Sequence, residues 1–275
     1  MFKNKKVKTI EEGLDKKEVA SRSKAILGDD TTFVANESYK ASRTNIIFTV
    51  PNDSGCNIIM FTSSVPGEGK TTTCVNTAIS FGQTGAKVLL IEADMRRPKV
   101  CECLDFEIKE GLSNVLGGFS KTEDVIKRLD KYPIDIMVAG WIPPNPTELL
   151  ASKKIKEVLD AVRDKYDYIF IDTPPVNTVT DAVLLTKHVD GVIVVVRSKY
   201  TAKPALRKAV KALEFSNAKI MGFIVNDSAV ARKYSRYRGY RKYGYYRKYG
   251  DYYQRSAKQT PYEEEKESAG KADKK

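Results

Sequence analysis

A short glycine-rich segment carries the residues best suited to binding phosphate. It reads Ser64-Val-Pro-Gly-Glu-Gly-Lys-Thr71 and lies between an apolar, β-rich run and a helix-like stretch. Its glycines let the backbone turn N–H groups toward phosphate oxygens, and the start of a helix adds partial positive charge. Lys70 supplies a cation to the β- and γ-phosphates, and Thr71 offers a hydroxyl to Mg²⁺. The segment predicts a P-loop for ATP, formed by Ser64, Gly67, Glu68, Gly69, Lys70, Thr71 and Thr72.

Acidic residues follow two of the apolar runs. The segment Glu92-Ala-Asp94-Met-Arg96 ends one run, and Asp172 ends another. In an open α/β sheet, ligands bind outside the carboxyl ends of the strands, which is where these acids fall. A P-loop needs carboxylates to hold its metal, so three acids beside such a loop favour a site over solvated turn residues. We expect Mg²⁺ to be held by Thr71, Asp94 and Asp172.

The predicted elements explain how these groups come together. Six apolar runs indicate strands at 58–62, 88–91, 134–138, 168–171, 192–196 and 220–225. Helix-like stretches cover 37–50, 71–83, 148–165 and 203–215. Continuous apolar strands that alternate with helices predict an α/β fold with a mostly parallel central sheet and helices on both faces. Some antiparallel pairing at an edge is the alternative, and it leaves the site unchanged.

Length and composition fit one sizeable α/β domain with tails. The chain has 275 residues, of which 41% are hydrophobic and 30% charged, as in ordinary globular proteins. No apolar run approaches the roughly 20 residues of a membrane span, and the N-terminus lacks the apolar stretch of a secretory signal. The four cysteines show no CxxC pairing, so we expect reduced thiols and no metal site among them. These features predict a cytoplasmic protein.

The C-terminal segment has a different composition from the rest. Its tyrosines recur every three residues from position 234, and nine Lys or Arg residues stand against one acid between Arg232 and Arg255. Too few aliphatic residues remain there to build a core, which predicts disorder. We therefore divide the chain into a flexible or helical lead-in (1–35), a P-loop domain (36–228) and a disordered basic tail (229–275).

Three interpretations of this tail compete. It could be a solvated basic segment, or a nucleic-acid binder in which aromatics stack on bases and cations meet phosphates. It could also be a cluster of phosphate acceptors, since each phosphate adds about −1.5 to −2 charges and a handful would reverse the sign of the tail. A nucleotide site on the same chain favours the third interpretation. The acceptors would be Tyr234, Tyr237, Tyr240, Tyr243, Tyr245, Tyr246, Tyr249, Tyr252 and Tyr253.

As a set, these residues resemble the bacterial tyrosine kinases (BY-kinases) that control capsule and exopolysaccharide synthesis. The resemblance spans about 37–226 together with the tail. Its motifs are Glu37-Ser-Tyr-Lys40-Ala-Ser-Arg43, the P-loop, the Walker A′-like Leu90-Ile-Glu-Ala-Asp-Met-Arg-Arg-Pro98, Gly111-Leu-Ser-Asn-Val-Leu-Gly117, Ile142-Pro-Pro-Asn-Pro146 and Ile171-Asp-Thr-Pro-Pro-Val176. The combination of the Walker A′ segment with the tyrosine tail is the specific part, because many ATPases share the P-loop.

The resemblance implies an ATP-dependent autokinase that phosphorylates its own tyrosine tail in trans to regulate polysaccharide synthesis and export. It implies a P-loop NTPase fold like that of MinD and ParA, with ATP and Mg²⁺ as cofactors. The residue at position 92 would help activate the incoming tyrosine, and Arg96 would help with charge or orientation. The expected catalytic set is Lys70, Glu92, Asp94, Arg96 and Asp172.

The resemblance also implies partners. A ring-shaped homo-oligomer, such as an octamer, would use the helix that carries Glu37, Lys40 and Arg43 as its interface. A transmembrane polysaccharide co-polymerase would act as adaptor and hold the protein at the inner face of the cell membrane, and a cognate tyrosine phosphatase would reverse the modification. Two departures stand out. Glu92 replaces the usual Asp, and Lys40 replaces an Arg and so loses its bidentate fork.

The alternatives are weaker. A MinD/ParA-like ATPase switch carries a signature lysine early in its loop, where this chain has Val65, and it needs no tyrosine cluster. Nucleic-acid binding as the main function is disfavoured, and salt-sensitive retention that depends on the tail would reveal it. His188 is interpreted as structural and Trp141 as loop packing. Asn226 ends the last apolar run and is predicted to bind adenine, with an ordinary turn as the alternative.

Overall fold

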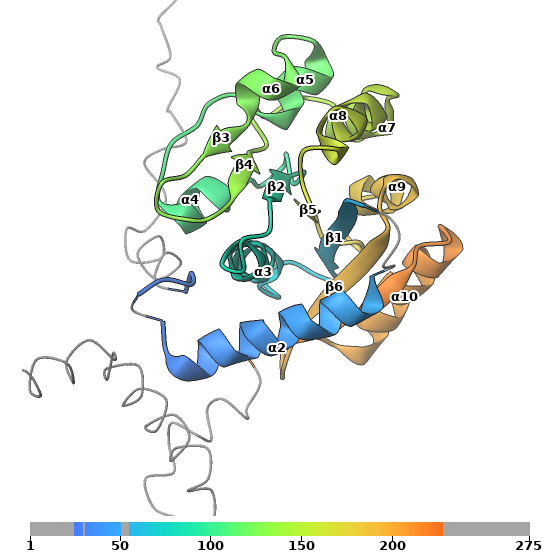
Figure 1. The fold of residues 1–275 in the computed structure, drawn as a ribbon. Helices are drawn as coiled ribbons and strands as arrows, with labels where there is room; N and C mark the ends of the chain where they lie inside the picture. The colour runs from blue at the N-terminus through green and yellow to red at the C-terminus, as the bar shows by residue number, and fades with distance from the viewer. Residues whose placement is uncertain (1–24, 30, 51–54, 228–275) are drawn as a thin grey trace, which may run out of the picture. The chain divides into compact units, whose positions relative to one another are not determined.

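The structure is a computed structural model that describes residues 25–29, 31–50 and 55–227 (Figure 1). Within these ranges the chain builds a seven-stranded sheet in the order β3-β4-β2-β5-β1-β6-β7. The strands are β1 (Asn57–Ser63), β2 (Val88–Glu92), β3 (Lys127–Arg128), β4 (Asp135–Met137), β5 (Tyr168–Asp172), β6 (Gly191–Arg197) and β7 (Ile220–Asn226). Only β3 pairs antiparallel, with β4 at one edge. The prediction of a mostly parallel α/β sheet is confirmed.

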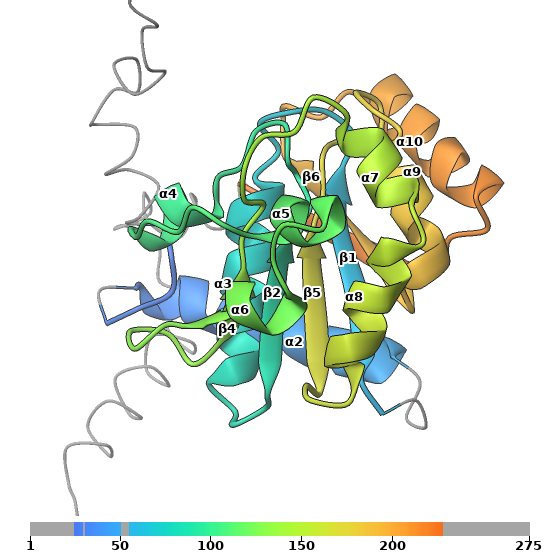
Figure 2. The same cartoon turned by 90° about the horizontal axis from the view of Figure 1, so that it is seen from above.

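Helices cover both faces of this sheet. They are α2 (Phe33–Thr49), α3 (Lys70–Gly82), α4 (Val100–Leu104), α5 (Leu112–Gly117), α6 (Thr122–Val125), α7 (Pro146–Ala151), α8 (Lys154–Arg163), α9 (Asp181–Leu185), the 3₁₀ turn η2 (Thr186–His188) and α10 (Lys203–Phe215). Side chains alternate along each strand, so Ile58 and Met60 of β1 pack on one side while Ile59 and Phe61 pack on the other. Helices α2, α3 and α4 cover one face, and α5 to α10 cover the other (Figures 1 and 2).

The predicted strands and long helices are found with changes at α2, α7–α8 and β3, and the short helices α4, α5, α6 and α9 and the turn η2 were not predicted. The helix predicted at 148–165 is two helices, α7 and α8, because Ser152 adopts an extended backbone and its hydroxyl donates to the Leu149 carbonyl. Helix α2 begins at Phe33, four residues before the predicted start, where the Thr32 side chain accepts the N–H of Ala35. The two-residue strand β3 has no apolar run and was not predicted.

Aromatic packing fixes helix α3, which follows the P-loop. This helix is buried almost all round, so it is held by contacts on every side. The Phe81 ring packs edge-on against Tyr168 and Phe170 of β5, with centroids 4.5 and 5.1 Å apart. Each such pair adds about 0.5–1.5 kcal/mol beyond the burial of its surface. The packing sets the start of α3 beside the carboxyl end of β5.

Strands β1, β2, β5 and β6 run parallel and end at the same edge of the sheet (Figure 2). The P-loop, the acids after β2 and the acid that ends β5 therefore meet there, as predicted. Among the described residues, no helix is both long enough and apolar enough to span a bilayer. The tyrosine tail and most of the lead-in lie outside the described ranges, and the domain limits at 35/36 and 228/229 stay predictions.

Candidate active site

The P-loop turns through two glycines with positive φ. Gly67 has φ 85° and Gly69 has φ 88°, in the left-handed region that other residues adopt at a cost. Gly69 is also crowded, since a Cβ there would lie 2.0 Å from Asn226 Nδ2. That amide donates to the Glu68 carbonyl at 3.1 Å, so the end of β7 supports the loop. The structure places Asn226 in contact with the P-loop backbone, and adenine binding stays a prediction.

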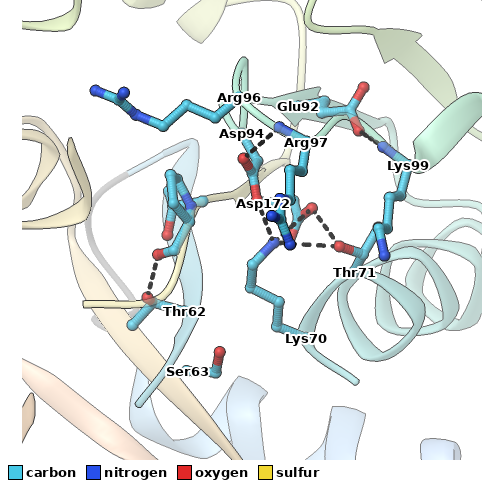
Figure 3. A network of polar contacts seen from close by, with 12 residues as sticks. Thr62, Ser63, Lys70, Thr71, Glu92, Asp94, Arg96, Arg97, Lys99 and Asp172 are labelled. Carbon is cyan, nitrogen blue, oxygen red and sulfur yellow. Dashed lines mark hydrogen bonds and ion pairs between the residues drawn. The ribbon is translucent and has the colours of Figure 1, made fainter. Parts of the chain in front are cut away.

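Four polar side chains converge where α3 begins. Lys70 Nζ lies 3.1 Å from Asp94 Oδ2, 3.3 Å from Asp172 Oδ1 and 3.2 Å from Thr71 Oγ1. The Thr71 hydroxyl donates to Asp172 Oδ2 at 2.7 Å. Figure 3 shows Lys70 reaching up between the two carboxylates. Sequence reasoning predicted these four residues as one site, and the structure brings them together.

Lys70, Asp94 and Asp172 are all buried, so the charges of their neighbours in this group strongly affect the pKa values of Lys70 and Asp172. Burial lowers the pKa of Lys70, but attraction to Asp172 and Asp94 outweighs it and holds that pKa above the usual value. Lys70 is therefore a permanent cation in this arrangement. Removing one member of a buried charge pair costs about 3–5 kcal/mol, because the remaining charge has no partner.

The Glu68 side chain holds the first residues of the P-loop through hydrogen bonds. Its buried carboxylate accepts N–H groups of Ser64 at 2.6 Å and Val65 at 2.9 Å, together with the Ser64 hydroxyl at 3.0 Å. The Thr201 hydroxyl, in the segment after β6, donates to the same carboxylate. These contacts fix the first half of the loop, so the Glu68 side chain positions the loop backbone.

Glu92 does not join the cluster of Lys70, Thr71, Asp94 and Asp172, which we call the lysine group. Its side chain is buried, and its carboxylate accepts the backbone N–H groups of Lys99, Val100 at 2.8 Å and Ala139 at 3.2 Å. Burial raises the pKa of Glu92 to about 7 although these N–H groups oppose the shift. Figure 3 shows the carboxylate directed to Lys99 and not to Lys70. The carboxylate closes the loop that carries Asp94, because it ties the end of β2 to the start of α4.

Arg96 is also directed away from the lysine group (Figure 3). Its Nε donates to Asp181 Oδ2 at 2.9 Å and its Nη2 donates to Thr147 Oγ1 at 2.7 Å. Asp181 is fully buried, so Arg96 neutralises a carboxylate that would otherwise be costly. This pair links the loop after β2 to helices α7 and α9. The predicted help of Arg96 with charge or orientation in catalysis stays a prediction.

The oxygen atoms of the lysine group suit Mg²⁺. The ion takes one or two carboxylates together with phosphate oxygens and waters, and a P-loop hydroxyl is a usual addition. Thr71 and Asp172 are already in contact, and Asp94 lies across Lys70 from them. Within the described ranges no group of three or more His, Cys, Asp or Glu side chains is placed to hold a metal by itself. The donors fit a metal that is shared with phosphate oxygens.

Sequence reasoning missed the segment that follows β6. There Tyr200 donates its hydroxyl to the Pro66 carbonyl at 3.0 Å, and Arg197, the last residue of β6, donates from Nη1 to the Gly67 carbonyl at 3.3 Å. Tyr200 would also be the nearest neighbour of any side chain at Gly67. The available signal was position, since this segment ends a predicted strand at the same edge of the sheet.

The helix predicted to form a subunit interface makes contacts within its own chain. Arg43 Nη1 donates to the carbonyl of Ser80 in α3, and to its hydroxyl at 3.1 Å. Lys40 forms an exposed ion pair with Glu37 at 2.8 Å. Glu37 and Lys40 remain open to solvent, whereas Arg43 anchors α2 to α3. An interface at this helix stays a prediction.

The fold and the lysine group together define a P-loop nucleotide-binding protein. The family model described as AAA domain matches residues 56–221, which include the loop, both acid-bearing strand ends and most of the sheet. The tyrosine-protein kinase YwqD of Bacillus subtilis (strain 168) is 40% identical over 202 residues, covering 74% of this chain and 84% of that protein. The putative tyrosine-protein kinase CapB of Staphylococcus aureus is 32% identical, covering 74% and 88%.

Solved structures agree with these relatives. The chimerical protein CapA2B2 superposes with a TM-score of 0.69 and 34% identity, over 75% of this chain and 90% of that chain. The chain therefore belongs to the family of bacterial tyrosine kinases, the BY-kinases, and is a protein-tyrosine kinase. The septum site-determining protein MinD from Pyrococcus horikoshii OT3 is a more distant relation, with 26% identity and a TM-score of 0.54 over 62% of this chain and 70% of that one.

Proposed function

We propose that this kinase transfers the γ-phosphoryl group of ATP to tyrosines of its own C-terminal tail, in trans. The observation that carries the proposal is the convergence of Lys70 with two carboxylates and a hydroxyl at the start of α3. The named tyrosine kinases among the relatives support the reaction, and the nine clustered tyrosines supply acceptors on the same chain. The acceptors proposed are those at positions 234–253.

In this proposal ATP lies on the P-loop with its phosphates at the start of α3. The backbone N–H groups of the first helical turn and Lys70 offset the charge of the β- and γ-phosphates. Mg²⁺ would be held by Thr71, Asp94 and Asp172, and when bound it neutralises charge on the phosphate oxygens. The MinD structure is a complex with Mg-ADP, which supports a nucleotide with magnesium at such a loop. Most of the catalysis is positioning and electrostatics.

The acceptor hydroxyl attacks the γ-phosphorus and ADP leaves. The bond from phosphorus to the tyrosine oxygen forms as the bond to the ADP oxygen breaks, and the phenolic proton moves to a carboxylate. We propose Asp94 as the acceptor of this proton, because its carboxylate lies in the lysine group. Glu92, the other candidate, has its carboxylate engaged by backbone N–H groups, so we assign it the positioning of the loop.

The wider setting follows from the family. We propose that the kinase regulates capsular or exopolysaccharide synthesis and export, works as a homo-oligomeric ring and is reversed by a tyrosine phosphatase. A transmembrane co-polymerase would act as adaptor and hold the kinase at the inner face of the membrane. The similarity to a chimera named CapA2B2 supports an association with a second component. The exposed Glu37 and Lys40 remain candidates for the ring interface.

The experiment follows phosphate on the tail. The full chain is incubated with Mg·ATP, with and without the cytosolic segment of a candidate adaptor, and phosphotyrosine is mapped by mass spectrometry. Lys70→Met removes the cation of the site, and Lys109→Met removes an exposed lysine as the matched control. Because Lys70→Met leaves two buried carboxylates together, circular dichroism must show that the variant is folded, and Asp94→Asn serves as a second variant.

Phosphate on Tyr234–Tyr253 in the parent and in Lys109→Met, but not in the two site variants, is the expected result. The rival ATPase switch predicts ATP hydrolysis with unmodified tyrosines even when a functional adaptor segment is present. That outcome would overturn the kinase proposal for the tail. Val65, which stands where such switches carry a signature lysine, already disfavours it.

A further inference from the structure

Three large apolar side chains stand exposed on two neighbouring loops. Phe119 is 74% exposed, Trp141 is 55% exposed and Ile142 is 64% exposed. The rings of Phe119 and Trp141 are in contact, with centroids 6.0 Å apart and planes tilted by 40°. We call Phe119, Trp141 and Ile142 the aromatic platform. Exposed aromatic surface of this kind marks an interaction site more often than a scattered single residue does.

The platform is rigidly built. The Ser113 hydroxyl donates to the Trp141 carbonyl at 2.6 Å, and the Trp141 N–H is 3.3 Å from the Asn114 side-chain oxygen. The carbonyl of Asn114 accepts the N–H of Phe119 at 2.8 Å. The Phe119 ring lies over Gly117, where a Cβ would approach it to 2.8 Å. Both loops are thus fixed by the start of α5, and little conformational entropy is lost when a partner binds.

The platform lies at the catalytic edge of the sheet. Trp141 follows β4, which is parallel to β2, so the carboxyl ends of both strands lie at the same edge. The loop continues into α7, where Thr147 accepts a hydrogen bond from Arg96 at 2.7 Å. Arg96 is two residues beyond Asp94, a member of the lysine group. The platform is therefore connected to the phosphate site through one short loop.

Charged side chains of both signs lie beside the platform, with the exposed Lys109 and Lys121 next to the acids of this region. Ser120, next to Phe119, donates its hydroxyl to the exposed carboxylate of Glu110 at 2.8 Å and holds it in place. Glu148 is exposed in the first turn of α7, beyond the proline-rich end of the loop. Lys154 opposes them, since its Nζ would lie 3.0 Å from a Cβ at Gly118. Cations carried by a partner would meet carboxylates at the rim and aromatic faces at the centre.

We propose that the aromatic platform binds the tyrosine-bearing segment, residues 234–253, of a second copy of this chain and so delivers it to the phosphate site. This proposal rests on the proposed function and names the docking surface for its substrate. The segment offers the matching chemistry, because tyrosines alternate with Arg and Lys and can stack on Trp141 and Phe119 while their neighbours pair with Glu110. Tyrosines three residues apart would share one face of a polyproline II chain, which has three residues per turn, so one after another could meet the platform.

The position at which the described chain ends supports the tyrosine-bearing segment as the partner of the platform. Strand β7 ends at the same edge of the sheet as the P-loop, with Asn226 hydrogen-bonded to the Glu68 carbonyl. The 48 residues of sequence that follow the described part, 228–275, carry all nine clustered tyrosines. In a homo-oligomer the segment is therefore present at high effective concentration, so a platform of modest affinity is sufficient.

The first test uses Trp141 as a reporter, because it is the chain's single tryptophan. A synthetic peptide with the sequence of residues 232–254 is titrated into the full chain, without nucleotide, and fluorescence is excited selectively at the indole. A peptide with every tyrosine replaced by alanine keeps the charge and serves as the control. We expect a saturable change in indole emission with the first peptide that is weakened severalfold with the second. Equal responses to both peptides would mean that only charge is sensed and would overturn the proposal.

The second test separates docking from chemistry. Trp141→Ala and Phe119→Ala are compared with Phe215→Ala, whose ring is 91% exposed at the end of α10 and far in sequence from the platform. We expect the KM for phosphorylation of the peptide to rise about three- to tenfold in the platform variants, as the loss of one or two aromatic pairs implies, with kcat and the KM for ATP unchanged. Phe215→Ala should behave as the parent.

The outcomes distinguish the two proposals. If the parent does not phosphorylate the peptide at all, even with a functional adaptor segment present, the proposed function fails. If the parent phosphorylates it and the platform variants do so with the parent's KM, the function stands and the docking surface is wrong. A fall in kcat alone, with KM unchanged, would also overturn the docking role, because it would show that the platform acts on the reacting groups and not on capture of the segment.

Discussion

Glu92 offers a sharp test of the site, because burial raises the pKa of its carboxyl while the hydrogen bonds from backbone N–H groups lower it. The carboxylate is 1% exposed and accepts N–H groups from two segments, yet burial raises its pKa to about 7 from an ordinary 4.5. The folded state thus holds the proton more tightly than the unfolded chain does. Between pH 4.5 and 7 the folded protein binds more protons, so the free energy of unfolding falls as pH rises. A shift of this size corresponds to about 3 kcal/mol.

Glu92→Gln removes this titration and keeps a similar shape. The glutamine amide resembles the protonated carboxyl, so the variant avoids the cost of a buried negative charge at high pH. It can still accept N–H groups from Lys99 and Val100, but its NH₂ faces the Ala139 N–H, which leaves a buried donor unpaired at a cost of about 1–3 kcal/mol. At pH 5 we expect the variant to be less stable than the parent by about this amount.

The assay is urea unfolding of the full chain, followed by circular dichroism from pH 5 to 8. The difference in unfolding free energy between Glu92→Gln and the parent isolates this carboxyl, because the two proteins share every other titrating group. We expect the difference to move in favour of the variant by about 3 kcal/mol as pH rises. Glu107→Gln, at an exposed carboxyl, is the control and should show no such trend. A difference that is constant with pH would show that the Glu92 carboxyl does not have a raised pKa in the folded protein.

The same variant bears on catalysis. If Glu92 positions the loop that carries Asp94, the glutamine amide preserves two of the three contacts and phosphorylation of the tail at pH 8 should fall less than about tenfold. A residue that accepts the tyrosine proton would cost about 10²- to 10⁴-fold when its carboxylate is removed. Rates for folded Glu92→Gln and Asp94→Asn, measured side by side, separate these roles.

Three further predictions use the same contacts. Gly69→Ala forces a positive φ and a Cβ 2.0 Å from Asn226 Nδ2, so we expect nucleotide affinity, measured by calorimetry, to fall at least tenfold while the fold persists. Arg96→Ala leaves the buried Asp181 carboxylate without its cation and should lower the unfolding free energy by about 2 kcal/mol, less than for a fully buried pair because Arg96 is 38% exposed. Chemical unfolding measures this, and an unchanged midpoint would contradict it. His188, the single histidine, has its pKa lowered below 6.5 by burial and nearby lysines, so its proton resonances should titrate below that value, and a higher pKa would contradict the packing.

The P-loop and its acids could be predicted from sequence because their signals are local. A strand, a glycine turn and a helix that starts with Lys-Thr specify a phosphate loop within about 25 residues. Parallel strands bring their carboxyl ends to one edge, so Asp94 and Asp172 could be placed near Lys70 before the order of strands was known. The sequence also predicted the extent of α10 and, to within one residue, the strands that carry the site.

Orientation within the site was not predictable in this way. Glu92 and Asp94 are two residues apart, yet one carboxylate turns to α4 and Ala139 while the other meets Lys70. The Glu92 carboxylate takes two N–H groups from Lys99 and Val100 nearby and a third from Ala139, 47 residues further along the chain, and the local sequence does not contain this last contact. Arg96 is similar, because its partner Asp181 lies 85 residues further along the chain.

Residue types and their spacing are enough to predict the chemistry: a phosphate-binding loop, acids for a metal and a tail of acceptors. Tertiary structure alone decided which acid faces Lys70, that Arg43 anchors α2 to Ser80, and that Phe119 and Trp141 meet on one surface. The physical reason is that buried charges and N–H groups must be paired by whatever the fold brings near. This pairing depends on how distant segments pack together, and the spacing of residues along the chain does not reveal that packing.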